Sequence, residues 1–367
     1  MTKILGGVAA NDSADNESAA PDAPVQPTLP TLILANDMIE NIKTARLEDD
    51  LPDKMLARLR SPPREPDALN PITKTSMGIF NALVSGSQRM YNAVRHVLRQ
   101  HRPTPIIIDS YHLVKPKIER VTGVMQISTQ MCINSCVAYT GPFKDLDKCP
   151  KCRIDRYKEN LKTKKLEPQQ QSYTIPLDPQ IQALWRTSEG ADRMRYRNHK
   201  IEEIIQELNR SGRIPKFEDV FHGTECLGAH RSGKIGPDDV MVMFAVDVAQ
   251  LYRDKESDCW IGSWVVFALS PDLLYKKRFV LPACFVPGPN KPDNMESFLL
   301  PSFRHVSALQ KEGLRVYDGH QQCYIISRPF LTFGAADTVA LPVLSGSVGH
   351  HGNSGCRQLW HAWSTQA

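Results

Sequence analysis

The chain has 367 residues, of which 41% are hydrophobic and 23% charged, and its formal net charge is +5. This size and composition predict a globular protein of two or three domains, and the mild basic excess permits a nucleic-acid partner without requiring one. No apolar run approaches the roughly 20 residues of a membrane-spanning helix, and the acidic N-terminus is not that of a signal peptide. We therefore expect an intracellular, non-secreted protein that does not contact a membrane.

The first third of the sequence predicts a disordered tail followed by helices. Residues 1–30 are rich in Ala, Asp, Ser and Pro and have few large apolar side chains, which is typical of disorder. Residues 31–125 are predicted as a helical region. Within it, 75–101 repeats apolar side chains at three- and four-residue steps, with a break between two helices near Gly86. The basic end of this stretch is more typical of a solvated helix terminus than of direct DNA contact.

Four cysteines in the region 126–158 have the spacing of a zinc site. They form a C-x3-C pair and a C-x2-C pair, with twelve residues between the pairs. Two such loops let four soft thiolates converge on one tetrahedral Zn²⁺, and four thiolates leave no open position for catalysis. The alternative is four buried free thiols that are close only in sequence. We expect a structural zinc ion held by Cys132, Cys136, Cys149 and Cys152.

Residues 159–237 are predicted to be a linker followed by an amphipathic helix. The polar, proline-containing stretch 161–180 predicts an exposed linker. The stretch 192–213 has its isoleucines on one stripe, which predicts a helix that buries that stripe. Its basic side chains are predicted to form a solvated face, and contact with a phosphate backbone is the less favoured alternative. These side chains are Arg193, Arg195, Arg197 and Lys200.

From residue 238 onward the pattern is that of strands. Three apolar runs, joined by short polar or proline-containing connections, predict an antiparallel meander. A helix that contains Pro301 follows, and then a further strand that ends at Asp337. Asp247 follows the first apolar run, which ends at Val246. On position alone, an acid at the end of a strand is more typical of ordinary strand termination than of a metal ligand.

Several segments, taken together and in this order, resemble a known family. They are "MCINSCVAYTGPFKDLDKCPKCRIDRY", "IPLDPQIQALWRTSEGADRMRYR", the run from Asp254 to Asp318, and "LSGSVGHHGNSGCR". In these segments the chain resembles the CACTA-type (En/Spm-like) DDE transposases of mushroom-forming fungi. The resemblance covers roughly residues 45 to 360.

The resemblance implies an α+β chain in which an RNase H-like catalytic domain follows a helical N-terminal region and a zinc-binding region. It also implies transposon-end DNA as the partner and, from that partner, a nuclear location. Members of the family hold two divalent ions, Mg²⁺ or Mn²⁺, with three acidic residues, and carboxylates suit these hard cations. By the resemblance, Asp247 corresponds to the first of these acids and Asp337 to the second.

The sequence departs from the family pattern in ways that bear on activity. Val248, and Thr-Val-Ala after Asp337, stand where the family has glycine-containing motifs, and glycine permits a close backbone approach. The third acid of the family would lie beyond Ala367, and the last ten residues show no resemblance. We therefore expect residues 238–367 to be a truncated, inactive RNase H-like domain whose fourth strand has an uncovered edge. The alternative is a non-catalytic, zinc-containing module that binds nucleic acid or another partner.

Other candidate sites carry weaker signals. His350, His351 and Cys356 have ligand chemistry for a metal ion, but a glycine-rich turn is the favoured interpretation. Trp260 and Trp264 lie on one side of the second strand and are expected in the core rather than in a base-stacking platform. Three nearby acids are predicted to be loop residues: Glu225, Asp238 and Asp239. The remaining cysteines are predicted to be buried free thiols: Cys226, Cys259, Cys284 and Cys323.

Overall fold

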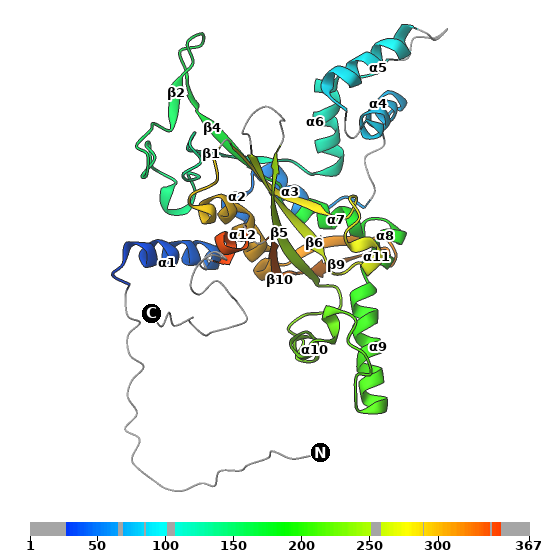
Figure 1. Cartoon of the computed structure of the whole chain (residues 1–367). Helices are drawn as coiled ribbons and strands as arrows, with labels where there is room; N and C mark the ends of the chain where they lie inside the picture. Colours follow the sequence, from blue (N-terminus) through cyan, green and yellow to red (C-terminus); the bar gives the residue numbers. More distant parts are fainter. Residues whose placement is uncertain are drawn as a thin grey trace, which may run out of the picture.

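The computed structural model describes residues 27–64, 69–83, 86–100, 107–250, 258–288, 290–337 and 340–345. Within these ranges the chain is an α+β protein built around one six-stranded mixed sheet, with helices packed on it and hairpins at its margins (Figure 1). No helix of these ranges is long and apolar enough to cross a membrane. The predicted tail falls mostly outside the described residues, and His350, His351 and Cys356 fall wholly outside them.

The central sheet has the strand order β1-β4-β7-β6-β5-β10. Its strands are Ile127–Met131 (β1), Gln170–Thr174 (β4), Val240–Gln250 (β5), Asp258–Val266 (β6), Leu281–Pro287 (β7) and Pro329–Ala336 (β10). Neighbouring strands are antiparallel except β10, which is parallel to β5. β5, β6 and β7 are the predicted meander, which the pairing confirms. β10 stands at one end of the strand order, as expected for the fourth strand of this region.

Alternation along β5 assigns its side chains to two different cores. Val242, Phe244 and Val246 belong to the main core, whereas Met241 packs into a second cluster with residues of α9 (Tyr196–Ser211) and α10 (Thr224–Arg231). Residues two apart on a strand share a face, so the odd-numbered positions of β5 all point away from the main core. Both faces of the first half of the strand are therefore covered, which explains why this run is apolar throughout.

Helix α12 (Met295–Glu312) covers the main-core face of the sheet. The Asn294 side chain accepts a hydrogen bond from the Ser297 N–H at 3.0 Å and so begins the helix. Phe303 of this helix stacks edge-on against Phe244 of β5, with 5.1 Å between the ring centroids. The helix continues past Pro301, so the predicted helix is confirmed.

The N-terminal helices divide into two groups. α1 to α3 pack on the body, where Arg304 of α12 pairs with Asp50 at 2.9 Å and Ser307 donates to the Ile42 carbonyl at 2.8 Å. α4 to α6 enclose a small core of their own around Tyr91 and project from the body (Figure 1). Their bounds are Pro30–Lys43 (α1), Leu47–Asp50 (α2), Asp53–Arg60 (α3), Pro71–Ala82 (α4), Gln88–Gln100 (α5) and Tyr111–Thr122 (α6).

The exposed linker predicted at 161–180 is wrong. Its first part supplies β3 (Leu166–Pro168), which forms a hairpin with the preceding β2 (Tyr157–Glu159), and a later part supplies β4 to the central sheet. Ser172 and Thr174 of β4 are buried, because small polar side chains can line a sheet that is covered by neighbouring elements. The helix α7 (Asp178–Trp185) that follows is mostly buried as well.

Two further features were not predicted in the last third of the chain. The apolar segment expected as a single strand contains β9 (Cys323–Ser327) as well as β10, and β9 forms a hairpin with β8 (Leu314–Asp318) beside the sheet. Cys226 is half-buried and Cys323 is exposed, so the prediction of a buried thiol fails for Cys323, whereas Cys259 and Cys284 are buried as expected.

The predicted helix at 192–213 is resolved as α8 and α9, and its isoleucine stripe is buried as expected. The solvated basic face is wrong for two of its four side chains. Arg197 is only 1% exposed and donates to the Gly236, Pro237 and Asp239 carbonyls. Arg195 pairs with the buried Asp318.

The remaining helical elements are Gly141–Phe143 (η1), Ser188–Arg193 (α8), Tyr196–Ser211 (α9), Val220–His222 (η2), Thr224–Arg231 (α10), Pro271–Leu274 (α11) and Leu341–Ser345 (α13).

Candidate metal centre and a pair of carboxylates

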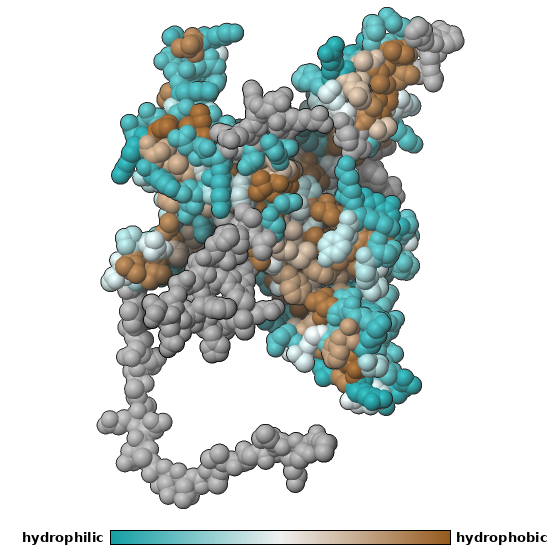
Figure 2. All heavy atoms as spheres, in the orientation of Figure 1, coloured by the Kyte–Doolittle hydropathy of each residue, from teal (hydrophilic) through white to brown (hydrophobic). Residues whose placement is uncertain are grey.

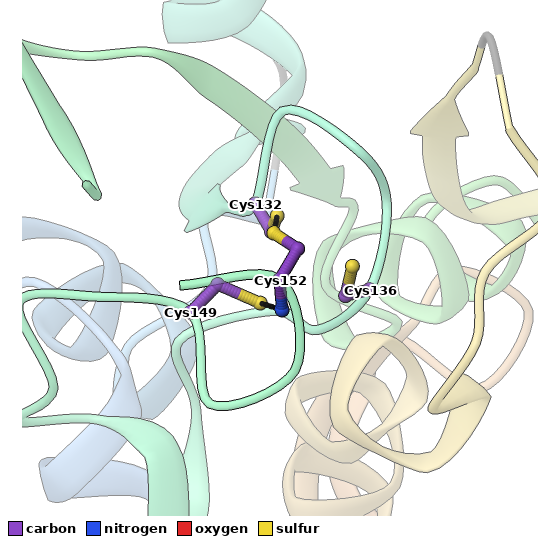
Figure 3. Close-up of side chains that lie close together, drawn as sticks. All are labelled: Cys132, Cys136, Cys149 and Cys152. Carbon is purple, nitrogen blue, oxygen red and sulfur yellow. Dashed lines mark hydrogen bonds between the residues drawn. The ribbon is translucent and has the colours of Figure 1, made fainter. Parts of the chain in front are cut away.

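The four cysteines predicted as zinc ligands lie together in the structure. Their Sγ atoms are all within 4.8 Å of one another, and they converge from two loops (Figure 3). Tetrahedral zinc with Zn–S bonds of about 2.3 Å requires sulfur atoms about 3.8 Å apart. The Cys132 and Cys152 sulfurs are 3.4 Å apart, which is too long for a disulfide, whose S–S bond is about 2.05 Å. The residues present therefore fit one four-thiolate zinc ion.

The two loops have the same backbone plan. In the first loop the Cys132 N–H donates to the carbonyl of Val137, five residues on, at 2.9 Å, and in the second the Cys149 N–H donates to Ile154 in the same way. Each loop turns through a residue with positive φ, Ser135 at 58° and Arg153 at 64°. The Cys152 N–H also points at the Cys149 sulfur, 3.5 Å away. Backbone hydrogen bonds thus fix both loops in a geometry in which their thiols face one another.

Burial sets the protonation of this site before any metal binds. It raises the pKa of Cys132 and of Cys136, because a thiolate loses hydration in the buried loops. Burial acts in the same direction on Cys152, but hydrogen bonds from the Ile154 backbone and from the neighbouring thiols outweigh it and bring its pKa to about 7. The site therefore offers one readily ionised thiol, Cys152, next to Cys132 and Cys136, which hold their protons more tightly until a metal displaces them.

The cysteine loops dock on the beginning of α12. The Asn294 N–H donates to the Cys136 carbonyl at 2.9 Å, and the Asp293 N–H donates to the Ser135 carbonyl at 3.1 Å. The Ser297 hydroxyl accepts a hydrogen bond from the Ala138 N–H at 2.9 Å. This docking was not predicted, because no local signal in the sequence links residues so far apart. It ties the candidate zinc site to the helix that covers the central sheet.

Of the two predicted metal-binding acids, Asp247 lies on β5 and Asp337 directly follows β10, the parallel neighbour of β5. Asp247 is exposed on β5, and the alternation of that strand directs its side chain away from the main core. Asp337 directly follows the β10 residue Ala336, which pairs with Val246. The register therefore brings Asp337 level with Asp247. No other acid or histidine of the described residues joins them in a group of three close enough to hold one ion.

Each of the two carboxylates also has a local hydrogen bond. The Asp247 Oδ1 accepts from the Val248 N–H at 2.8 Å, and the Asp337 Oδ1 accepts from the Ala340 N–H at 2.6 Å, at the start of α13. Asp337 therefore has a structural role in the turn that precedes α13, whatever else it binds. Val248 packs against the main core, on the face opposite Asp247, so its branched side chain does not crowd the face that Asp247 occupies.

The other acids considered from the sequence are structural. Asp239 is buried and its carboxylate accepts from the Gly236 and Arg328 N–H groups at 2.7 and 2.8 Å. Burial raises the pKa of its neighbour Asp238. Glu225 lies in the first turn of α10 rather than in a loop. Trp260 and Trp264 are buried in the main core, as predicted.

Comparison of the chain with protein-family models and with curated proteins gives no match in either case. The four-cysteine site and the carboxylate pair therefore have to be interpreted from their own geometry.

Proposed function

We propose that the chain is a DNA-binding protein of the CACTA-type (En/Spm-like) DDE transposase kind, with an RNase H-like sheet. The observation that carries the proposal is the parallel pairing of β10 with β5 at the end of an antiparallel β5-β6-β7 meander. This pairing sets Asp337 level with Asp247, although the two acids are far apart in the sequence. A nuclear location follows from the proposed DNA partner.

In this proposal Asp247 and Asp337 hold Mg²⁺ or Mn²⁺. Neighbouring strands in a sheet are about 4.8 Å apart, so carboxylates at level positions are within reach of a single cation. Such an ion would supply activation of an attacking hydroxyl or stabilisation of a leaving oxygen at a phosphodiester. The chain contributes the two carboxylates and an exposed face on which the DNA backbone can approach them.

We propose cation binding without efficient strand cleavage for the part of the chain that the structure describes. Two-metal chemistry needs enough acidic ligands to fix both ions, and among the described residues no third acid or histidine forms a metal-binding group with Asp247 and Asp337. One divalent ion held by two carboxylates would be bound weakly and would keep several waters.

Binding of Mn²⁺, followed by its electron paramagnetic resonance signal, tests the carboxylate site. Asp247→Asn should reduce binding by the purified chain, because it removes one of two charged ligands. Asp37→Asn is the matched control, since Asp37 is an exposed acid on α1 and is not one of the proposed ligands. Equal Mn²⁺ binding by the wild type and Asp247→Asn would contradict the proposal.

A second candidate is a non-catalytic, zinc-containing nucleic-acid-binding module. The complete set of four cysteines favours it, together with the hydrogen bond that the Asp337 carboxylate accepts in the turn before α13. This candidate predicts DNA binding that is unchanged in Asp247→Asn, falls steeply with salt, and gives no nicking with Mg²⁺ or Mn²⁺. Mn²⁺ binding that is reduced in Asp247→Asn would instead favour the first proposal, and efficient metal-dependent nicking would contradict both.

A further inference from the structure

The β2–β3 hairpin carries a local excess of positive charge. Residues 156–168 contain five cations, Arg156, Lys158, Lys162, Lys164 and Lys165, against two acids, Glu159 and Glu167. This net +3 in one short hairpin compares with +5 for the whole chain. The hairpin is therefore one of two concentrated basic projections of the described residues, the other being α5, whose residues 88–100 contain three arginines and no acid (Figure 1).

The lysines of the hairpin are free to meet a partner. Lys158, Lys162 and Lys165 are exposed and have no ion-pair partner among the described residues, whereas Lys164 lies 3.5 Å from Glu159. The tip also carries exposed apolar side chains, Leu161 at 83% and Leu166 at 71% (Figure 2 shows this projection as mainly hydrophilic with an apolar patch). Exposed leucines among lysines at a projecting tip indicate a contact surface rather than a solvated turn.

The shape of the tip is fixed by Asn160. Its side-chain oxygen accepts hydrogen bonds from the Lys162 and Thr163 N–H groups at 3.0 and 3.3 Å, and its amide donates to Glu167 at 2.8 Å. Lys164 takes the positive φ of 55° that closes the turn. An ordered tip loses less conformational entropy on binding than a mobile loop.

The base of the hairpin is held by the cysteine loops. The Arg156 guanidinium donates to the Leu146 carbonyl at 3.1 Å and lies 4.4 Å from the centre of the Tyr139 ring. The Arg156 N–H donates to the Asp147 carbonyl at 2.7 Å. The loops of the candidate zinc site thus hold the base of the hairpin. A two-stranded ribbon is only marginally stable by itself, so this support makes the hairpin more rigid.

We propose that the β2–β3 hairpin enters the major groove of duplex DNA, with its lysines on the flanking phosphates and its leucines against the bases. This inference rests on the proposed DNA partner and names the surface that contacts it. A two-stranded ribbon fits the major groove of B-DNA, which is about 12 Å wide, and thymine methyl groups in that groove offer apolar contacts. The deep, narrow major groove of duplex RNA excludes such a ribbon, so the shape favours DNA.

The direction of the hairpin agrees with the position of the carboxylates. β5 runs toward the end of the molecule from which the β2–β3 hairpin and the α4–α6 helices both project (Figure 1). Asp247 lies in the last part of that strand. A duplex held by the hairpin would therefore lie on the side of the molecule where β5 carries its acid.

A triple variant of the full chain tests the proposal. Lys158→Gln, Lys162→Gln and Lys165→Gln together remove three exposed charges from the hairpin, and Arg213→Gln, Lys216→Gln and Lys234→Gln remove three exposed charges beside α9 and α10, at the opposite end (Figure 1). Fluorescence anisotropy with a labelled DNA duplex of mixed sequence, over a series of salt concentrations, measures affinity. Zinc content and thermal unfolding show that each variant is folded.

The hairpin variant should bind duplex DNA on the order of 100-fold more weakly at about 0.1 M salt. The slope of its plot of log K against log salt should be smaller by about 2.7, because each lost phosphate contact reduces the slope by about 0.9. The control variant should keep the wild-type affinity and slope. If the hairpin variant binds like the wild type, the hairpin assignment is wrong while the DNA partner stands. If the wild type binds no DNA, both proposals fail.

Two further measurements separate the groove from simple charge attraction. Leu161→Gln should weaken DNA binding without changing the salt slope, because it removes an apolar contact and no charge. Duplex RNA of the same sequence should bind more weakly than DNA. Equal binding of RNA through the same lysines, or an unaffected Leu161→Gln, would overturn insertion into the major groove.

Discussion

Asp337 directly follows the strand β10 and continues its parallel register with β5, so that it lies level with Asp247, one residue beyond the pair that Ala336 forms with Val246. The relationship depends on the whole connection between β7 and β10, because α12 and the β8–β9 hairpin return the chain to the opposite edge of β5. The acids therefore meet only in the completed fold. This makes their pairing a more specific observation than the position of either acid at the end of a strand.

Two substitutions separate the two roles of the Asp337 carboxylate, which accepts a hydrogen bond from the Ala340 N–H and is proposed to bind a metal ion. Asp337→Asn keeps an oxygen that can accept from the Ala340 N–H but loses the negative charge, whereas Asp337→Ala loses both. We expect Asp337→Asn to unfold almost as the wild type does and to bind Mn²⁺ more weakly. Asp337→Ala should in addition lose about 1 kcal/mol of unfolding free energy. Urea denaturation and Mn²⁺ titration measure the two effects, and undiminished Mn²⁺ binding by Asp337→Asn would exclude its carboxylate as a ligand.

The strands of the meander and α12 could be predicted because their burial is visible in local sequence. β5 begins with a continuous apolar run from Val240 to Val246, β6 is mostly apolar, and α12 repeats apolar side chains with a capping asparagine at its start. β4 could not be predicted, since its buried face carries Ser172 and Thr174 and its pairing with β1 and β7 is set by distant residues. Local hydrophobicity does not report a strand whose place in the sheet is determined by its partners.

The candidate zinc ligands could be predicted because their chemistry is local. The spacing of the cysteines fixes two short loops, and a soft metal needs little else. The docking on Asn294 and Ser297 could not be inferred in the same way. Arg195 and Arg197 illustrate the same limit, because their helix has the charge pattern of a solvated face while Asp318 and the Gly236 carbonyl, which bury them, lie elsewhere in the sequence.

Loss of one cysteine ligand should destabilise more than the loops themselves. We expect Cys149→Ser to bind zinc more weakly, and each tenfold loss of affinity removes about 1.4 kcal/mol of zinc-linked stability when zinc is in excess. Hydrogen exchange should then increase at residues 132–152 and at the start of α12, because Asn294 donates to the Cys136 carbonyl. Cys323→Ser is the control, since this thiol is exposed and lies outside the cluster. Protection at Asn294 that is unaffected by zinc removal would show that the docking does not depend on the metal.

Zinc affinity should fall as the pH is lowered. Burial raises the pKa of Cys132 and Cys136, so zinc must displace their protons at neutral pH. Cys152 has a pKa of about 7, so it is mostly thiolate above that pH and also carries a proton below it. The plot of log affinity against pH should therefore steepen by one proton below about pH 7. Competition with a chromophoric chelator on both sides of pH 7 measures this slope, and an affinity that is independent of pH would contradict thiolate ligation.

The pair of Arg195 and Asp318 should contribute strongly to stability at neutral pH. The Asp318 side chain is 0% exposed, and its carboxylate also accepts from the His320 and Gln321 N–H groups at 2.8 and 2.9 Å. Burial alone would raise the pKa of Asp318, but the hydrogen bond from Arg195 and those from the backbone outweigh it and hold this pKa below its ordinary value. Asp318→Asn leaves the Arg195 charge without its partner, so we expect a loss of about 3 kcal/mol at pH 7.

The sign of the pH effect distinguishes this ion pair from a packing defect. Because folding lowers the pKa of Asp318, its stabilisation is fully present above the unfolded value of about 3.9 and is lost as the pH falls through the lower folded value. The difference between the wild type and Asp318→Asn should therefore be constant near neutrality and shrink in acid. Glu189→Gln is the control: it breaks the pair of Glu189 with Arg193, where the glutamate is largely exposed, and should cost no more than about 0.5 kcal/mol. Urea denaturation at several pH values gives these differences, and a gap that stays constant into acid would mean that Asp318 acts through its shape rather than its charge.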